Sequence, residues 1–195
     1  MRTTILLFLL STIIVYGGLL LPKTLLIEQS IDIHSSSAHI SSCLYDLPKW
    51  EKWLDWEHYE KTSDKNYIYS QFPQGVGAFM KLREENNSKN SEKVELYIQS
   101  IITQKPSKSD LQTLKYIANF ENLGTHIEGE FEVQSINRNS DTNVNSMLKF
   151  TLEIDLGDNP FVRYLAYFYY KSKIEKETNI SLEQLKKLCE SPVLG

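Results

Sequence analysis

The chain has 195 residues, of which 41% are hydrophobic and 24% charged, and its formal net charge is −4. This composition is typical of a globular domain and excludes a disordered chain, a collagen-like repeat and a coiled coil. A mildly acidic chain without a basic stripe is also a poor candidate for binding nucleic acid, because cationic side chains must replace the phosphate counterions there.

The first notable segment is an uncharged run at residues 5–21, ILLFLLSTIIVYGGLLL, which Arg2 and Lys23 bracket. A helix of this length, at about 1.5 Å per residue, just spans a hydrocarbon core of about 30 Å. A cleaved signal peptide is the alternative, but its apolar region is shorter and ends in small residues. We therefore expect residues 1–22 to be an uncleaved signal anchor and residues 23–195 to be one domain. The positive-inside bias favours a single-pass protein whose domain is exported to the periplasmic or extracellular side.

Beyond the run, residues 25–33 alternate between apolar and polar side chains, which predicts a strand. The serines at 35–37 offer a helix N-cap, and apolar residues at helical spacing follow them. Pro48 interrupts this pattern. Tryptophans at positions 50, 53 and 56 then predict a second short helical stretch.

Period-two alternation predicts six further strands, at residues 66–72, 75–83, 94–104, 114–120, 126–136 and 143–155. Asn159 as N-cap and Pro160 at the first helical position then predict a long helix over residues 161–190. Since one sheet with one apolar face needs one cover, this amphipathic helix is expected to pack against the sheet.

Four segments carry a family resemblance: SIDIHSSSAHI, DLPKWEKWLDW, GVGA at residues 75–78 and LEQLKKLCES. On these segments the chain resembles the SRPBCC (START-like, helix-grip) superfamily, in its polyketide cyclase/dehydrase-like group. The resemblance runs from about Lys23 to Ser191, and members with a short N-terminal membrane helix fit residues 5–21. It implies an α+β fold, in which a curved antiparallel sheet of about six to seven strands wraps around a long C-terminal helix. One transmembrane helix would precede this domain.

The resemblance also implies a cavity between sheet and helix that holds lipids or other apolar molecules, and no cofactor is expected. Such cavities bind by burying apolar area, with a few polar groups that fix orientation. Many members carry a tryptophan where this chain has Met80 and Leu82. For the tryptophans of this chain, core packing at the sheet edge is the alternative to a binding wall. The expected ligand contacts are Trp53, Met80, Leu82, Tyr116, Phe131, Phe150, Tyr164 and Phe168.

Motifs for metal or hydrolytic chemistry are missing from the sequence. None of the four histidines has HxxxH, HExxH or HxH spacing, so no metal site is expected. The cluster Glu57-His58-Glu60 is typical of a solvated loop. The chain has neither a GxSxG elbow nor a glycine-rich phosphate loop.

The two cysteines, Cys43 and Cys189, are most simply two small buried thiols. In the helix-grip fold that the resemblance implies, the first short helix packs near the far end of the long helix. A disulfide between them is therefore a second hypothesis, which an exported domain would permit.

The leading functional hypothesis is a membrane-anchored domain that binds a hydrophobic small molecule or lipid. One alternative is a cyclase or dehydratase acting on an apolar substrate, which a buried Asp, Glu or His facing the cavity would favour. A further alternative is an interaction or stress-related module whose core is filled by side chains. The sequence leaves all of these open, because residues that line a cavity and residues that fill it follow the same alternation.

Overall fold

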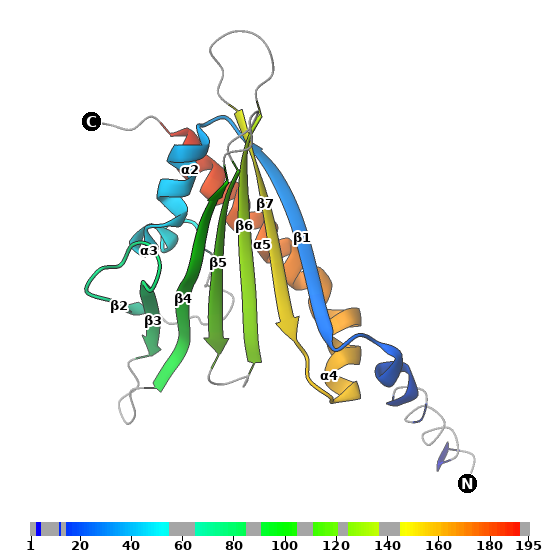
Figure 1. The fold of residues 1–195 in the computed structure, drawn as a ribbon. Coiled ribbons are helices and arrows are strands. Elements are labelled where there is room, and N and C mark those ends of the chain that lie inside the picture. Colours follow the sequence, from blue (N-terminus) through cyan, green and yellow to red (C-terminus); the bar gives the residue numbers. More distant parts are fainter. Residues whose placement is uncertain are drawn as a thin grey trace.

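The alternating segments form one antiparallel sheet in the computed structural model, with a long helix across one of its faces (Figure 1). The structure describes residues 3–4, 12, 15–54, 65–84, 91–104, 111–120, 125–136 and 145–191. The seven strands are β1 (Thr24–Ile33), β2 (Lys65–Tyr69), β3 (Phe79–Glu84), β4 (Ser91–Gln104), β5 (Leu111–Phe120), β6 (Thr125–Ile136) and β7 (Asn145–Asp155). Their order is β1-β7-β6-β5-β4-β3-β2, so β2 to β7 form a meander and β1 closes its far side.

The helices lie at the two ends of the strand meander in the sequence. Between β1 and β2 come α2 (Ser37–Leu44) and α3 (Leu47–Trp50). After β7 come α4 (Pro160–Leu165), a π-helical turn η1 (Ala166–Tyr170) and α5 (Lys171–Glu190). Both predicted N-caps are confirmed: Ser36 Oγ accepts from His39 N at 3.2 Å, and Asn159 Oδ1 accepts from Phe161 N at 3.0 Å. The α+β fold class and the predicted order of elements are confirmed as well.

One predicted boundary is wrong at the start of β3. The strand begins at Phe79, because Gly75 and Gly77 have φ angles of 81° and 84°. Such left-handed backbone is open to glycine and makes a turn, which the bond from Ala78 N to Gly75 O closes at 3.1 Å. The two glycines therefore precede the strand.

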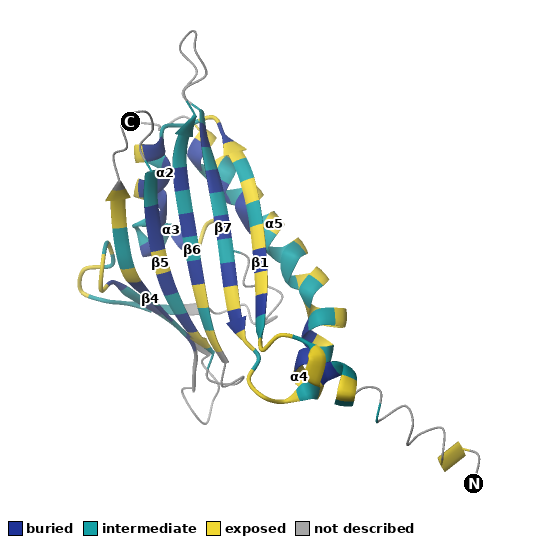
Figure 2. Ribbon diagram, turned by 45° about the vertical axis from the view of Figure 1, so that its right-hand side comes forward, coloured by how far each residue is buried: buried dark blue, intermediate teal, exposed yellow. Residues whose placement is uncertain are grey.

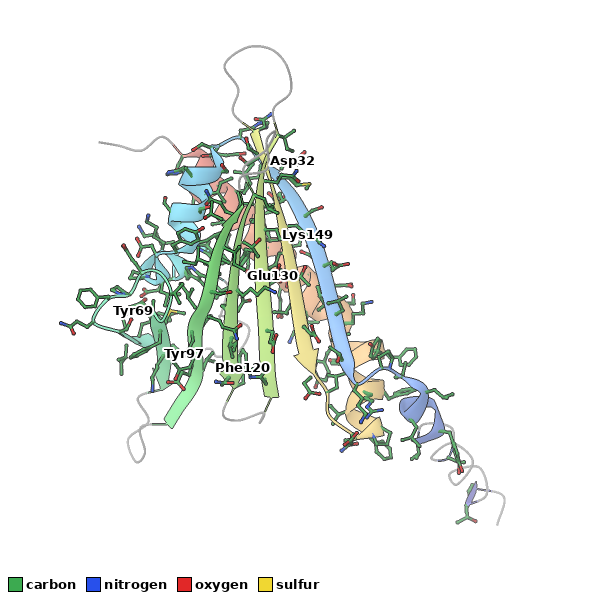
Figure 3. All side chains as sticks on the ribbon, viewed as in Figure 1. Asp32, Tyr69, Tyr97, Phe120, Glu130 and Lys149 are labelled. Carbon is green, nitrogen blue, oxygen red and sulfur yellow. The ribbon has the colours of Figure 1, made fainter. Side chains whose placement is uncertain are left out.

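The two faces of the sheet differ in burial, as the alternating colours along each strand show (Figure 2). On the face away from α5, ion pairs join neighbouring strands: Lys115 Nζ lies 2.9 Å from Glu130 Oε2, and Lys149 Nζ lies 2.9 Å from Glu28 Oε1 (Figure 3). The inward face carries the apolar core, which α2, α3 and α5 cover. This is the half-buried antiparallel sheet that period-two alternation predicts.

Most of the predicted membrane segment, residues 5–21, lies outside the described residues. Within the described part of the chain, no helix has the length and apolar character needed to span a membrane. Residues 15–20 are helical and lie beside α4 (Figure 1). A Cβ atom added to Gly18 would fall 2.1 Å from the carbonyl oxygen of Pro160, so only glycine permits this close approach.

Candidate functional site

A cavity of about 110 Å³ lies between the inward face of the sheet and α5. Strands β4 to β7 form its floor, α5 forms its roof, and the segment after α3 closes one side. Its lining is almost wholly apolar. The residues that line it are Trp53, Leu54, Leu96, Tyr116, Ala118, Phe120, Ile127, Phe131, Phe150, Leu152, Ile174, Glu177, Thr178, Ser181 and Leu182.

Packed aromatic rings form one wall of the cavity. The Phe131 ring is 4.7 Å from that of Phe150 and 5.7 Å from that of Tyr116, measured between centroids. Trp53 stands edge-on to Phe131 at 6.0 Å. Offset-stacked, tilted and edge-to-face rings are favourable aromatic geometries, so these contacts stabilise the wall.

A glycine makes room for this wall. Gly129 on β6 pairs directly with Tyr116 on β5, and the phenol ring lies across the glycine. A Cβ atom at position 129 would fall 2.0 Å from the ring, which no packing can accommodate without moving Tyr116. Burial of this tyrosine raises the pKa of its phenol above the usual range, so the group stays neutral.

Two buried polar atoms of the lining residues have no hydrogen-bond partner among the described residues. They are the indole Nε1 of Trp53, whose side chain is 1% exposed, and Oε1 of Glu177. The neighbouring Trp50 differs, because its Nε1 donates to Leu44 O at 2.9 Å. Buried polar groups are normally hydrogen-bonded, and each unsatisfied one costs about 1–3 kcal/mol. The apolar cavity therefore has one unused donor and one unused acceptor on its lining residues.

Glu177 is held near the cavity as a mostly buried carboxylate. Its side chain is 13% exposed, and Oε1 lies 3.8 Å from Nζ of Lys173, one helical turn earlier. That separation makes an ion pair but is too long for a hydrogen bond. Thr178 and Ser181, on the same side of α5, add hydroxyl groups to this part of the lining.

The structure brings half of the sequence-predicted contacts together. Four of the eight line the cavity: Trp53, Tyr116, Phe131 and Phe150. Met80 is buried, and Leu82 is half-buried, in another part of the core. The aromatic first half of the long helix does not reach the cavity.

Tyr164 and Phe168 lie apart from the cavity because the helix meets the lining only from Ile174 onward. Their rings pack in a tilted arrangement with centroids 4.6 Å apart, and Phe168 is 70% exposed. On this part of the helix the inward positions are instead Arg163, Ala166 and Tyr167. Sequence periodicity identified apolar positions along the helix but not which of them face the sheet.

Glu177 and Ser181 line the cavity but are not among the contacts that the sequence predicts. A signal was present, since residues 174, 177, 178, 181, 182 and 185 follow the helical period of one buried stripe. A carboxylate inside such a stripe is unusual and marks a position to examine. No sequence signal distinguishes the unsatisfied Trp53 from the satisfied Trp50.

The cavity lies toward the end of the sheet from which α4 leaves. Phe120 ends β5, Ile127 stands near the start of β6, and Leu152 stands near the end of β7 (Figure 3). The chain passes from β7 directly into α4, and β1 begins beside it. One end of the molecule thus holds the N-terminal helix, α4 and the Phe120 end of the cavity lining.

The two cysteines are neighbours between α2 and the C-terminal end of α5. Both are free and buried, and a hydrogen bond joins their thiols. The hydrogen bond from Cys189 is the main cause that lowers the pKa of the Cys43 thiol, helped by the neighbouring His39 and Lys49. The same contact raises the pKa of Cys189.

No cluster of three metal-ligating side chains occurs among the described residues. Trp56 and the Glu57-His58-Glu60 segment lie outside them, so these sequence predictions stay predictions. Of the remaining histidines, His126 is exposed on β6, as expected, with Nδ1 3.0 Å from Asn119 Oδ1.

Proteins with solved structures share this architecture. No family model matches the sequence, and no curated protein matches it. The structure is similar to truncated norcoclaurine synthase from Thalictrum flavum, with a TM-score of 0.50 and 12% identity over 87% of this chain and 95% of that chain. The chain has the helix-grip fold. A conserved protein from Geobacillus kaustophilus is also similar, with a TM-score of 0.49 and 11% identity over 85% of this chain and 95% of that chain.

Proposed function

We propose that this protein binds one small, largely apolar molecule that carries a hydroxyl group, in the cavity between the sheet and α5. The observation that carries the proposal is an apolar cavity with an unused donor, Trp53 Nε1, and an unused acceptor, Glu177 Oε1, on its lining residues. A hydroxyl can both donate to a carboxylate and accept from an indole N–H. A hydrocarbon would leave both groups unsatisfied.

The volume limits the size of the ligand. Drug-sized ligands occupy pockets of about 300–1,000 Å³, whereas a dry cavity of about 150 Å³ accepts benzene. A space of about 110 Å³ is smaller than that, so it takes at most a single small ring or the end of an acyl chain, with a slight outward shift of the lining side chains. It is also large enough to argue against a core that side chains fill completely.

A matched pair of ligands tests the proposal. p-Cresol and p-xylene have nearly the same shape, and only p-cresol has a hydroxyl. We expect calorimetric titration of the full chain to show p-cresol binding about tenfold more tightly, the value of one good hydrogen bond. Binding of neither compound, or equal binding of both, would contradict the proposal.

Two variants identify the groups responsible. Trp53→Phe keeps the ring and removes the donor, and Glu177→Met keeps the side-chain length and removes the acceptor. At least one of them is expected to abolish the preference for p-cresol over p-xylene. Glu183→Met, at an exposed position of the same helix, is the control and should bind like the unmodified chain.

A catalytic role is the second candidate, and Glu177 is the observation that favours it. A mostly buried carboxylate beside an apolar cavity is a position from which a proton can be transferred to or from a bound molecule. If the protein is an enzyme, Glu177→Gln removes turnover of the bound molecule while leaving its binding within a few-fold. If it is a binding protein, incubation leaves the ligand chemically unchanged.

We also propose that residues 5–21 anchor the chain in a membrane with the domain on the exported side. The uncharged run in the sequence supports this placement. A topology reporter fused after Gly195 should be active only in the exported compartment. Reporter activity in the cytoplasm would reverse the topology, and a mature protein that begins near Lys23 would show that the segment is cleaved.

A further inference from the structure

An exposed apolar surface surrounds the place where the N-terminal helix meets the domain. On α4 and η1 it comprises a stripe of exposed side chains that recur at helical spacing: Phe161, Val162, Leu165, Phe168 and Tyr169. Phe168 is 70% and Tyr169 67% exposed, values that are unusual for large rings. We call these five residues the α4 apolar stripe.

The stripe has no acidic neighbour along its helix. Between Pro160 and Tyr170 the one charged residue is Arg163, which is buried. Its guanidinium donates to Gly157 O at 2.9 Å and to Asp158 Oδ1 at 3.2 Å, so its charge is engaged inside the domain. The outward side of this segment is therefore uncharged over eleven residues. A helix that faces water normally carries charged or polar side chains on that side.

The helix of residues 15–20 is joined to α4 at this surface. Gly18 packs directly on Pro160, and Arg163 Nη1 reaches Leu21 O at 3.5 Å. Tyr16, Leu19 and Leu20 of the same short helix are exposed, Leu20 at 88%. The apolar surface thus continues from the stripe onto the last part of the uncharged run.

The position of this contact along the uncharged run indicates what covers the α4 apolar stripe. Gly18 stands three residues before Leu21, the last residue of the uncharged run, or about 5 Å along a helix axis. An amphipathic helix that lies in a membrane interface buries its apolar face by about 5–10 Å. A segment packed against Gly18 would therefore lie at the depth where headgroups meet acyl chains, and tyrosines are enriched at that depth.

We propose that the α4 apolar stripe docks on the surface of the lipid bilayer in which residues 5–21 are anchored. The inference rests on the anchor proposed above. Docking holds α4 and η1 in the membrane interface. It also sets the Phe120 end of the cavity lining, which lies at the same end of the sheet, close to the lipid.

The test uses the full chain in phosphatidylcholine vesicles. Phe168→Cys is labelled with an environment-sensitive fluorophore, and Val76→Cys, 63% exposed on the turn before β3, is the matched control. The unmodified chain shows any labelling of the two buried native thiols. Vesicles containing lipid brominated along its acyl chains quench only a fluorophore that contacts them.

The label at position 168 is expected to lose most of its emission in brominated vesicles, while the label at position 76 keeps it. Adding Leu165→Asp to Phe168→Cys should restore the emission, because a carboxylate is driven out of the interface. Adding Leu165→Asn provides a milder polar change in case the charge disturbs folding, and it should restore part of the emission.

Three results would overturn the inference, and they differ in what else they affect. If the chain floats with the vesicles but the label at position 168 is not quenched, the anchor stands and the docking is wrong. If emission at position 168 shifts to the blue without quenching, and the shift grows with the protein-to-lipid ratio, a second copy covers the stripe. If the chain does not float with the vesicles, both the anchor and the docking are wrong.

Discussion

At the scale of single residues, the cavity depends on where side chains are missing as much as on where they are present. Gly129 lets the Tyr116 ring lie flat across β6, and the ring in turn borders the cavity beside Phe131. Trp53 and Glu177 add the two unsatisfied polar atoms. Gly129 matters because it has no side chain, and Trp53 and Glu177 matter because each has an atom without a hydrogen-bond partner. Neither property can be read from a sequence pattern.

Gly129→Ala is expected to destabilise the protein. The added methyl group forces the Tyr116 ring toward the cavity, and overpacking of this kind costs about 1–3 kcal/mol. Denaturant unfolding of the variant measures the change in the free energy of unfolding. In a Tyr116→Leu background the same substitution should cost nothing measurable, and an equal cost in both backgrounds would show that ring contact is not the cause.

Replacement of Arg163 is also expected to lower the stability of the protein. Arg163 is 4% exposed and its side chain donates to the carbonyl oxygens of Gly157 and Leu21, so Arg163→Met removes the hydrogen bonds of a buried cation. We expect a loss of about 1–3 kcal/mol in the free energy of unfolding, with faster amide hydrogen exchange in residues 15–21. Lys23→Ala removes only the exposed pair with Asp158, and it should change stability by less than about 0.5 kcal/mol. Similar losses in both variants would argue against a structural role for Arg163.

At the scale of elements, the strands could be predicted from the sequence and the role of the long helix only in part. Alternation sets which strand residues face the core, and Tyr116, Phe131 and Phe150 are on that face as expected. The helix has apolar residues on more than one side, because the first half carries both an inward line and the exposed α4 apolar stripe. The helical period alone does not separate the inward line from the exposed stripe, so the sequence predicts Tyr164 and Phe168 as cavity contacts although they lie outside it.

Because α2 contacts the C-terminal end of α5, we expect Cys43 and Cys189 to form a disulfide when the protein is oxidised. Since the pKa of its thiol is lowered, Cys43 is the thiolate that attacks added hydrogen peroxide, forming a sulfenic acid and hydroxide. The thiol of Cys189 then displaces water and closes the disulfide. We expect the rate of closure to rise with pH and to level off below the pKa of an ordinary thiol, about 8.5, as the thiolate fraction saturates.

Closure should stabilise the protein by about 2–4 kcal/mol, because it joins distant parts of the unfolded chain. Thiol counting against pH and thermal unfolding of the oxidised protein measure the two effects. A rate that keeps rising to pH 8.5 would show that Cys43 is an ordinary thiol. Failure of the two cysteines to pair would show that α2 and α5 do not hold them in reach.

At the scale of the whole molecule, the helix-grip fold follows from the order of elements, but the size of its cavity does not. Residues that fill a core and residues that line a void obey the same alternation, so a volume of about 110 Å³ is a property of packing alone. The segment before the sheet is the opposite case. Its uncharged run is plain in the sequence, whereas its contact with α4 through Gly18 needed the structure.

The central claim is that a hydroxylated apolar molecule occupies the space between the sheet and α5. Methyl-resolved nuclear magnetic resonance of the full chain, titrated with p-cresol, tests it most directly. We predict saturable shifts of the methyl groups that line the cavity, on Leu96, Leu152 and Leu182, while the methyl groups of the buried Ile33, at the other end of β1, stay in place. Shifts spread evenly over the core, or no saturable shift at all, would contradict the claim.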